Sequence, residues 1–160
     1  MKKILVFIMS IVCFTACDKS DGQLKNNSLS IVEHSFSGCI NEEDWTKAAG
    51  SSYTTHRIIL EAKGNVLHIL KQNRFACGAK IELEISNEGN TITIHEVNKG
   101  GAAYCTCPAE YTSEITGMKE GVYTICIYPP AESDNWYYQP FVFNFKDGVK
   151  ETIDLEPSYY

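Results

Sequence analysis

Apolar and polar side chains alternate over much of the chain, in short segments that glycine and asparagine separate. In the segment 80–86, Ile81, Leu83 and Ile85 alternate with two glutamates. Because successive side chains of a strand point to opposite faces, this pattern predicts a strand with one buried face. The segment 91–97 returns with the same pattern after a turn rich in asparagine and glycine.

The pattern as a whole predicts about nine short strands, spaced roughly 8–12 residues apart. The predicted strands cover residues 29–34, 53–62, 66–72, 80–86, 91–97, 104–115, 122–128, 136–145 and 149–155. This rhythm is typical of an all-β domain. We predict a single antiparallel β-sandwich of immunoglobulin-like size, and a small β-barrel is the alternative fold.

One segment breaks the strand pattern. Asn41 is a candidate N-cap, acidic side chains follow it directly, and Gly50 comes after the last small apolar residues. These are start and stop signals of a helix. We therefore predict one short helix over 41–49, with Trp45 facing inward.

Composition limits the classes of partner. The chain has 160 residues, of which 44% are hydrophobic, so it is long enough for one domain with a proper core. Its formal net charge is −6, and the first 16 residues contribute two lysines and no acid. Such an acidic chain lacks the positive surface that nucleic acids attract, so we predict no nucleic-acid partner.

The N-terminus has the features of a bacterial lipoprotein precursor. Two lysines precede an apolar stretch, 4–14, which is shorter than the about 20 residues that span a bilayer. The following Phe-Thr-Ala-Cys sequence, which ends at Cys17, resembles the lipobox, where small residues precede a cysteine that is acylated. We predict a signal peptide over 1–16 and membrane anchoring through lipidated Cys17. A soluble secreted protein cleaved after Ala16 is the alternative.

The segment that follows the lipobox is polar and has no periodicity. We predict that residues 17–28 are the lipidated cysteine and a tether, and that 29–160 form the single β domain. Asp18 resembles an inner-membrane retention signal of enteric bacteria, whereas other bacteria sort lipoproteins by different rules. We expect a cell-envelope location, with the outer membrane, on its periplasmic or its surface face, preferred over the inner membrane.

Several motifs between Cys39 and Tyr128 carry a further resemblance. They are Leu-His-Ile-Leu at 67–70, Cys77, Ile-Thr-Ile-His-Glu at 92–96, Cys-Thr-Cys at 105–107 and Ile-Thr-Gly-Met-Lys-Glu-Gly-Val-Tyr at 115–123. Together they resemble a group of uncharacterised small lipoproteins of Bacteroidetes-type bacteria. The resemblance implies a β-rich fold and an envelope location, and it implies no particular activity.

Five cysteines follow the lipobox, which indicates an oxidising compartment. Cys105 and Cys107 lie on one face of one strand, too far apart for a relaxed mutual disulfide. We predict that these two form disulfides with Cys39 and Cys77, and the pairing stays open. Cys126 lies in an apolar strand, so we predict a free, buried thiol.

Two other uses of the cysteines stay as alternatives. A structural zinc site usually has two cysteines separated by two to four residues, whereas only Thr106 separates the close pair here. A redox-active pair needs an exposed thiol of low pKa, and the surrounding sequence shows no helix start or base that would provide it. We therefore predict no metal and no cofactor, with a thiol- or metal-binding protein as an alternative.

The histidines do not form a recognisable catalytic or metal-binding pattern. They are His34, His56, His68 and His95. Adjacent residues of a strand point to opposite faces, so His95 and Glu96 are not a ready-made site. The chain also lacks the serine motif of hydrolases. We predict no catalytic residue, although a pocket that joins His68 or His95 to a carboxylate would favour a small envelope enzyme.

The segment 134–143 is rich in aromatic side chains. If the strand is continuous, alternation assigns to the inner face Tyr137, Phe141, Phe143 and Phe145. It then places Trp136 and Tyr138 on the outer face, where they are candidates for stacking on sugar rings. A core strand with an amphipathic rim is the favoured interpretation, because aromatic side chains usually serve the core.

These features together favour a binding or interaction module over an enzyme. The predicted domain is tethered to a membrane and braced by disulfides, and it has no catalytic motif. Its ligand is expected to be a protein or a glycan.

Overall fold

The computed structural model describes residues 29–41, 56–101, 103–130 and 136–159. The predicted signal peptide, the lipidated Cys17, the tether and most of the predicted helix at 41–49 lie outside these residues. Eleven strands and no helix occur in the described part of the chain.

Five strands form the first sheet, and every neighbouring pair is antiparallel. In spatial order they are β1 (Ser30–Phe36), β6 (Thr106–Thr116), β3 (Val66–Ala76), β2 (Arg57–Lys63) and β10 (Lys150–Asp154). The hairpin between β2 and β3 turns at Gly64, whose positive φ of 59° suits glycine. Its amide donates to Asp147 Oδ1 at 2.7 Å.

Four strands form the second sheet, which contains one parallel pair. In spatial order they are β4 (Ile81–Glu88), β5 (Thr91–Asn98), β7 (Gly121–Tyr128) and β9 (Phe141–Phe145). The β5–β7 pair is parallel, whereas β4–β5 and β7–β9 are antiparallel. A separate two-stranded ribbon joins β8 (Trp136–Tyr138) to β11 (Pro157–Tyr159).

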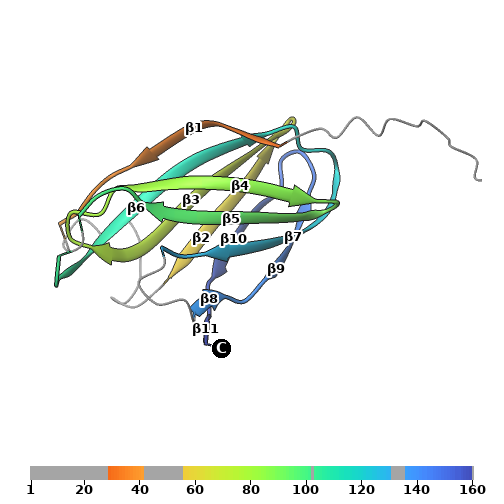
Figure 1. The fold of residues 1–160 in the computed structure, drawn as a ribbon. Helices are drawn as coiled ribbons and strands as arrows, with labels where there is room; N and C mark the ends of the chain where they lie inside the picture. Colours follow the sequence, from red (N-terminus) through yellow and green to blue (C-terminus); the bar gives the residue numbers. More distant parts are fainter. Residues whose placement is uncertain (1–28, 42–55, 102, 131–135, 160) are drawn as a thin grey trace, which may run out of the picture.

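The two sheets pack against each other around one apolar core (Figure 1). The first sheet contributes, among others, Ile58, Leu60, Leu67 and Ile115, and the second contributes Ile92, Ile94, Ile125, Phe143 and Phe145. The predicted β-sandwich is confirmed, and the sheets do not close into a barrel. The inward positions follow the predicted alternation of apolar and polar residues.

The chain changes sheets after β6. The glycine-bounded turn that begins at Gly117 leads from β6 in the first sheet to β7 in the second. Met118 in this turn is buried, and its amide donates to Asn65 O of the first sheet at 3.1 Å. The two neighbouring strands therefore face each other across the core and do not pair in one sheet.

The predicted continuous strand at 136–145 is wrong. It divides into β8 and β9 at Gln139 and Pro140. Proline has no amide hydrogen for a strand ladder, and the Gln139 amide donates to Glu156 O at 3.1 Å, outside the second sheet. Because of this break, alternation cannot be carried from β9 back to β8.

Candidate functional sites

The cysteines lie at one end of the first sheet, where β3 and β6 meet. The β3–β6 pairing sets Phe75 opposite Cys107, and the Cys77 amide donates to Cys105 O at 2.8 Å just beyond the strands. This contact holds Cys77 against Cys105, and the two form a disulfide.

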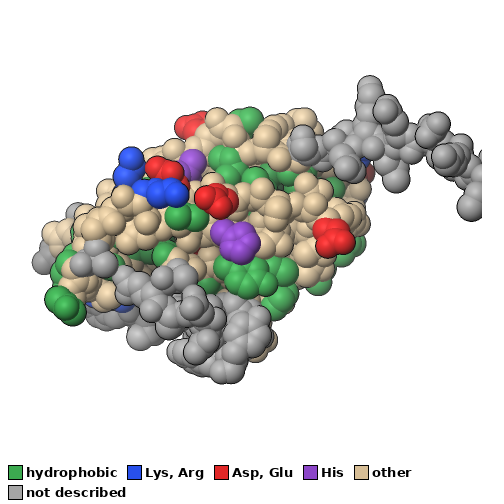
Figure 2. Space-filling view, viewed as in Figure 1, with side chains coloured by type: hydrophobic (Ala, Val, Ile, Leu, Met, Phe, Trp, Pro, Cys, Tyr) green, Lys and Arg blue, Asp and Glu red, His purple; other side chains and the backbone are tan. Residues whose placement is uncertain are grey.

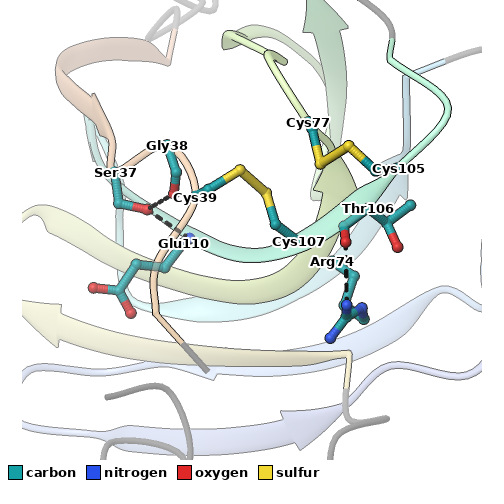
Figure 3. Close-up of a disulfide and its surroundings, with 9 residues drawn as sticks. All are labelled: Ser37, Gly38, Cys39, Arg74, Cys77, Cys105, Thr106, Cys107 and Glu110. Atoms are coloured by element: carbon teal, nitrogen blue, oxygen red, sulfur yellow. Dashed lines mark hydrogen bonds between the residues drawn. A yellow bond between two sulfur atoms is a disulfide. The ribbon is translucent and has the colours of Figure 1, made fainter. Parts of the chain in front are cut away.

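A second disulfide joins Cys39 to Cys107 (Figure 3). The segment after β1 runs along β6, because the Ser37 amide donates to Glu110 O at 2.9 Å and the Ile40 amide donates to Pro108 O at 2.8 Å. The four cysteines predicted to form disulfides thus make two bridges between separate segments. The bridges close loops of 68 and 28 residues, and a disulfide typically contributes about 2–4 kcal/mol to stability, more for longer loops.

An open cleft of about 200 Å³ lies at the cysteine-bearing end. Its lining includes Phe75, Ala79, Ile81, Pro129 and Pro130, together with the polar Asn73, Arg74, Asn98 and Thr106. Phe75 and Ile81 are almost fully buried and form an apolar floor. We call this feature the end cleft.

The core contains a buried ion pair between the two sheets. Lys71 of β3 and Glu96 of β5 are buried, and the Lys71 ammonium donates to Glu96 Oε1. The Tyr111 hydroxyl donates to the same oxygen at 2.8 Å. Burial lowers the pKa of Lys71, while the Glu96 carboxylate opposes that shift. Burial and the adjacent Glu96 raise the pKa of Tyr111 well above its ordinary value.

Aromatic rings and a second set of hydrogen bonds enclose the Lys71 ammonium. It lies 4.3 Å from the centre of the Tyr138 ring, which is cation–π distance. Asn73 Nδ2 donates to the Tyr138 hydroxyl at 2.9 Å, and that hydroxyl lies 3.2 Å from His56 Nδ1. Burial lowers the pKa of His56, which favours the neutral imidazole that accepts such a bond.

The charged side chains of this buried polar cluster, Lys71 and Glu96, are fully shielded from solvent. The end cleft is lined by Asn73 but not by Lys71 or Glu96. Within the described residues, Glu96 Oε2 is buried without a hydrogen-bond partner. The cluster therefore connects β3, β5 and β6 through charge-assisted hydrogen bonds, and its geometry indicates a structural role.

A hollow of about 300 Å³ lies on the outer face of the first sheet. The cross-strand pair His68 and Glu114 lines it, with His68 Nδ1 3.0 Å from Glu114 Oε1. Glu33, Glu61, Lys63 and Lys150 also line the hollow. Lys63 Nζ lies 3.1 Å from Glu61 Oε1, and this hydrogen bond is the main cause of the lowered pKa of Glu61. This is the pairing of a histidine with a carboxylate in a pocket that would favour an enzyme.

The outer face of the second sheet carries scattered charges (Figure 2). His95 is exposed and stacks on Tyr128, with ring centres 4.9 Å apart and an interplanar angle of 16°. Glu84 lies opposite His95 in the β4–β5 register. Acidic, basic and hydrophobic side chains are interspersed in this view, and no large patch of one charge covers it.

The structure changes the prediction for one of the two candidate aromatic residues. Tyr138 is buried, with 1% of its surface exposed, so its predicted place on an outer ligand-binding face is wrong. The break at Pro140 reverses its orientation relative to β9. The side chain of Trp136, the other candidate, lies outside the described residues.

Cys126 is free, as predicted, but it is only half-buried. Its neighbours Ile125 and Ile127 point into the core, so Cys126 points to the outer face of β7. Burial raises the pKa of its thiol, which makes it a poor nucleophile at neutral pH.

Sequence reasoning missed the buried ion pair, although a signal for it exists. Lys71 occupies an inward position of β3 between Ile69 and Asn73, and Glu96 occupies the inward position of β5 after Ile94. Opposite charges at inward positions of two strands indicate a buried pair, because an unpaired buried charge is very costly.

Comparison with known proteins found no match to this chain among protein-family models, curated proteins or solved structures. Among the described residues, no helix is long and apolar enough to cross a membrane.

Proposed function

We propose that the protein is a lipid-anchored lipoprotein of the cell envelope whose β-sandwich is a binding module, with the end cleft as its contact site. One observation carries the binding role. The cleft draws its walls from both sheets, at the end of the molecule that two disulfides brace. A contact surface that is rigid before binding loses less entropy when a ligand binds.

The dimensions and lining of the end cleft indicate the kind of group that it receives. Its volume of about 200 Å³ is below the roughly 300–1,000 Å³ of sites that enclose a whole small molecule. The apolar floor of Phe75 and Ile81 suits one apolar side chain of a partner protein or the apolar face of one sugar ring. Arg74 and Thr106 at the polar side of the cleft supply hydrogen-bonding groups.

Filling the cleft tests this proposal. Thr106 lines the cleft and is exposed, whereas Thr152 is an exposed threonine on β10 that does not line it. The protein is screened against arrays of glycans and against envelope and host proteins, and each ligand found is retested on both variants. We expect Thr106→Trp to weaken binding at least tenfold and Thr152→Trp to leave it unchanged. Equal affinity of the two variants would place the binding site elsewhere.

The anchoring part of the proposal rests on the lipobox and is tested separately. Cells that express the protein are labelled with a fatty-acid analogue, and the envelope membranes are then separated from the soluble fraction. We expect label on the wild type and loss of both label and membrane association in Cys17→Ala. Equal labelling of the two proteins would contradict anchoring through Cys17, and protease treatment of whole cells reports which face carries the domain.

A small envelope hydrolase is the second candidate, and the His68–Glu114 pair in the outer hollow favours it. In this function His68 is the base that activates a water molecule, and Glu114 orients its ring. His95→Gln is the matched control, because His95 is a histidine on the opposite sheet. Hydrolysis of chromogenic esters or glycosides that His68→Gln abolishes and His95→Gln retains would rank this function above the binding module.

A further inference from the structure

The two disulfides lie in direct reach of each other. The sulfur atoms of Cys39, Cys77 and Cys107 all lie within 4.8 Å of one another. Cys39 and Cys107 belong to one disulfide, whereas Cys77 belongs to the other. The Cys77 sulfur of the Cys77–Cys105 bridge therefore lies beside both sulfurs of the Cys39–Cys107 bridge, as Figure 3 shows.

The strand geometry explains this proximity. Cys105 lies directly before β6 and Cys107 lies in it, on either side of Thr106, so their side chains point to the same side of the extended chain. Cys77 lies opposite Cys105, to which its amide donates a hydrogen bond, and it is diagonal to Cys107 two positions along. Diagonal side chains on neighbouring strands are within mutual reach. Cys77 is thus placed to bond with either cysteine of the Cys-Thr-Cys motif.

Exposure differs between the two ends of each bridge. Cys39 and Cys105 are exposed, whereas Cys77 and Cys107 are half-buried. A thiol that approaches from solvent therefore meets Cys105 in one bridge and Cys39 in the other. Cys77 belongs to one bridge and lies beside the other, and solvent thiols reach it less readily because it is half-buried.

We propose that the four cysteines form a thiol–disulfide exchange site, in which a dithiol protein is the partner and Cys77 is the internal nucleophile. A thiolate of the partner attacks Cys105 Sγ, the Cys77–Cys105 bond breaks, and Cys77 leaves as a thiolate. The second thiolate of the partner then attacks the partner's sulfur in the mixed disulfide. This releases Cys105 as a thiol and leaves the partner oxidised to a disulfide.

The released Cys77 thiolate carries the exchange to the other bridge. It attacks Cys107 Sγ, a Cys77–Cys107 bond forms, and the exposed Cys39 leaves as a thiolate that takes up a proton. Two electrons and two protons have then passed from the partner's dithiol to the domain, which retains one disulfide. The remaining disulfide moves between Cys39–Cys107 and Cys77–Cys107, so the segment after β1 is alternately tied to β6 and released.

Two matched variants test the internal step without any reductant. Cys105→Ser leaves Cys77 as a free thiol beside the Cys39–Cys107 bridge, whereas Cys77→Ser leaves Cys105 free, which is outside the group of three neighbouring sulfurs. Both variants also carry Cys126→Ser, so that no other free thiol of the domain takes part. Disulfides of the mature protein are mapped after rapid quenching in acid and alkylation.

We expect Cys77–Cys107 linkages, with or without Cys39–Cys77 linkages, beside Cys39–Cys107 in the Cys105→Ser protein. In the Cys77→Ser protein we expect Cys39–Cys107 alone, with no linkage of Cys105 to Cys39 or Cys107, because Cys105 lies outside the group of neighbouring sulfurs. Only Cys39–Cys107 in both variants would overturn the proposal. Wild-type protein treated with less than one equivalent of dithiothreitol gives a second measurement that needs no substitution at the site. There, a Cys77–Cys107 bridge supports the exchange, whereas only the two original bridges, intact or reduced independently, would contradict it.

Discussion

At the scale of single residues, the buried ion pair is the most demanding feature of the core. Removing two charges from water costs several kcal/mol for each ion, and the mutual attraction only partly offsets this. Lys71 and Glu96 meet this demand with the Tyr111 hydroxyl and the Tyr138 ring. Because the partners come from different sheets, the pair also fixes how β3 aligns with β5.

Removing one member of this pair should destabilise the domain strongly. Lys71→Met leaves the Glu96 carboxylate buried with only the Tyr111 hydroxyl as a donor, and we expect the free energy of unfolding to fall by about 3–5 kcal/mol. The measurement is urea unfolding followed by circular dichroism. The double variant Lys71→Met/Glu96→Leu should recover most of the loss, and additive losses in the double variant would show that the charges are not coupled.

Tyr111→Phe should give a loss of stability that depends on pH. At neutral pH the variant loses a hydrogen bond to a charged group, which contributes about 1.5–3 kcal/mol. The pKa of Tyr111 is raised in the folded protein, so its stabilising contribution is complete below pH about 10 and declines as pH rises through the folded-state value. The difference in unfolding free energy between wild type and variant should therefore shrink above pH 10.

The same unfolding experiment on Tyr104→Phe provides the control, because Tyr104 is fully exposed. This variant should match the wild type at every pH. A loss in Tyr111→Phe that stays constant up to strongly alkaline pH would contradict the assigned hydrogen bond to Glu96.

At the scale of elements, the loop between β5 and β6 depends on a close backbone approach at Gly100. A Cβ atom there would lie 2.4 Å from Gly78 O and 2.6 Å from the Lys80 nitrogen. Asn98 Oδ1 accepts from the amides of both Lys80 and Gly100 and holds the two segments together. This packing sets the path by which the chain reaches the cysteine-bearing end.

A methyl group at Gly100 should therefore disturb this loop. We expect Gly100→Ala to lower the free energy of unfolding by about 1–3 kcal/mol, since backbone atoms must move to make room. The adjacent Gly101 has open space at the corresponding position, so Gly101→Ala should stay within about 0.5 kcal/mol of wild type. Thermal unfolding of the two variants compares them directly, and equal stability would mean that the loop is not tightly packed.

Local patterns predicted the strands well but not their partners. The alternation of Ile81, Leu83 and Ile85 is visible in the sequence because it depends only on neighbouring residues. Which sheet receives β6 and which receives β7 depends on contacts between distant segments. The orientation of Tyr138 was also inaccessible, because one proline interrupts the phase of the strand.

The candidate sites show the same division. The sequence predicts four cysteines as disulfide partners from strand geometry and number, yet the proximity of Cys77 to the Cys39–Cys107 bridge arises only when β3, β6 and the segment after β1 come together. His68 meets Glu114 because β3 and β6 pair in one register, although the two residues are 46 positions apart in the sequence and belong to no common motif. Side-chain groups built from several strands leave little trace in a linear pattern.

At the scale of the whole molecule, covalent bridges provide a large share of stability. Two disulfides of about 2–4 kcal/mol each compare with the total of about 5–15 kcal/mol that is typical of a domain. Both bridges lie at one end, where they tie the segment after β1 and the segment after β3 to β6. The rest of the sandwich relies on its core.

Reduction should consequently lower the resistance of the protein to urea. We expect the free energy of unfolding to fall by about 4–8 kcal/mol when both bridges are reduced, with the urea midpoint displaced accordingly. Cys126→Ser serves as the control, because its thiol is not in a bridge, and it should leave the midpoint of the oxidised protein unchanged. A midpoint that is insensitive to reductant would contradict the stabilising role of the disulfides.

The order of the strands has a consequence for how the chain acquires its structure. The N-terminal β1 must wait for β6, and β5 must wait for β7, so each sheet is completed by a segment made much later. Pairings between distant segments slow folding, because loop-closure entropy is lost before the contacts form. Until β6 is in place, β1 presents an unpaired edge to other chains, and β5 does so until β7 is in place. Each disulfide contains Cys105 or Cys107 at the start of β6, so the native pairing forms only when β6 has docked in the correct register.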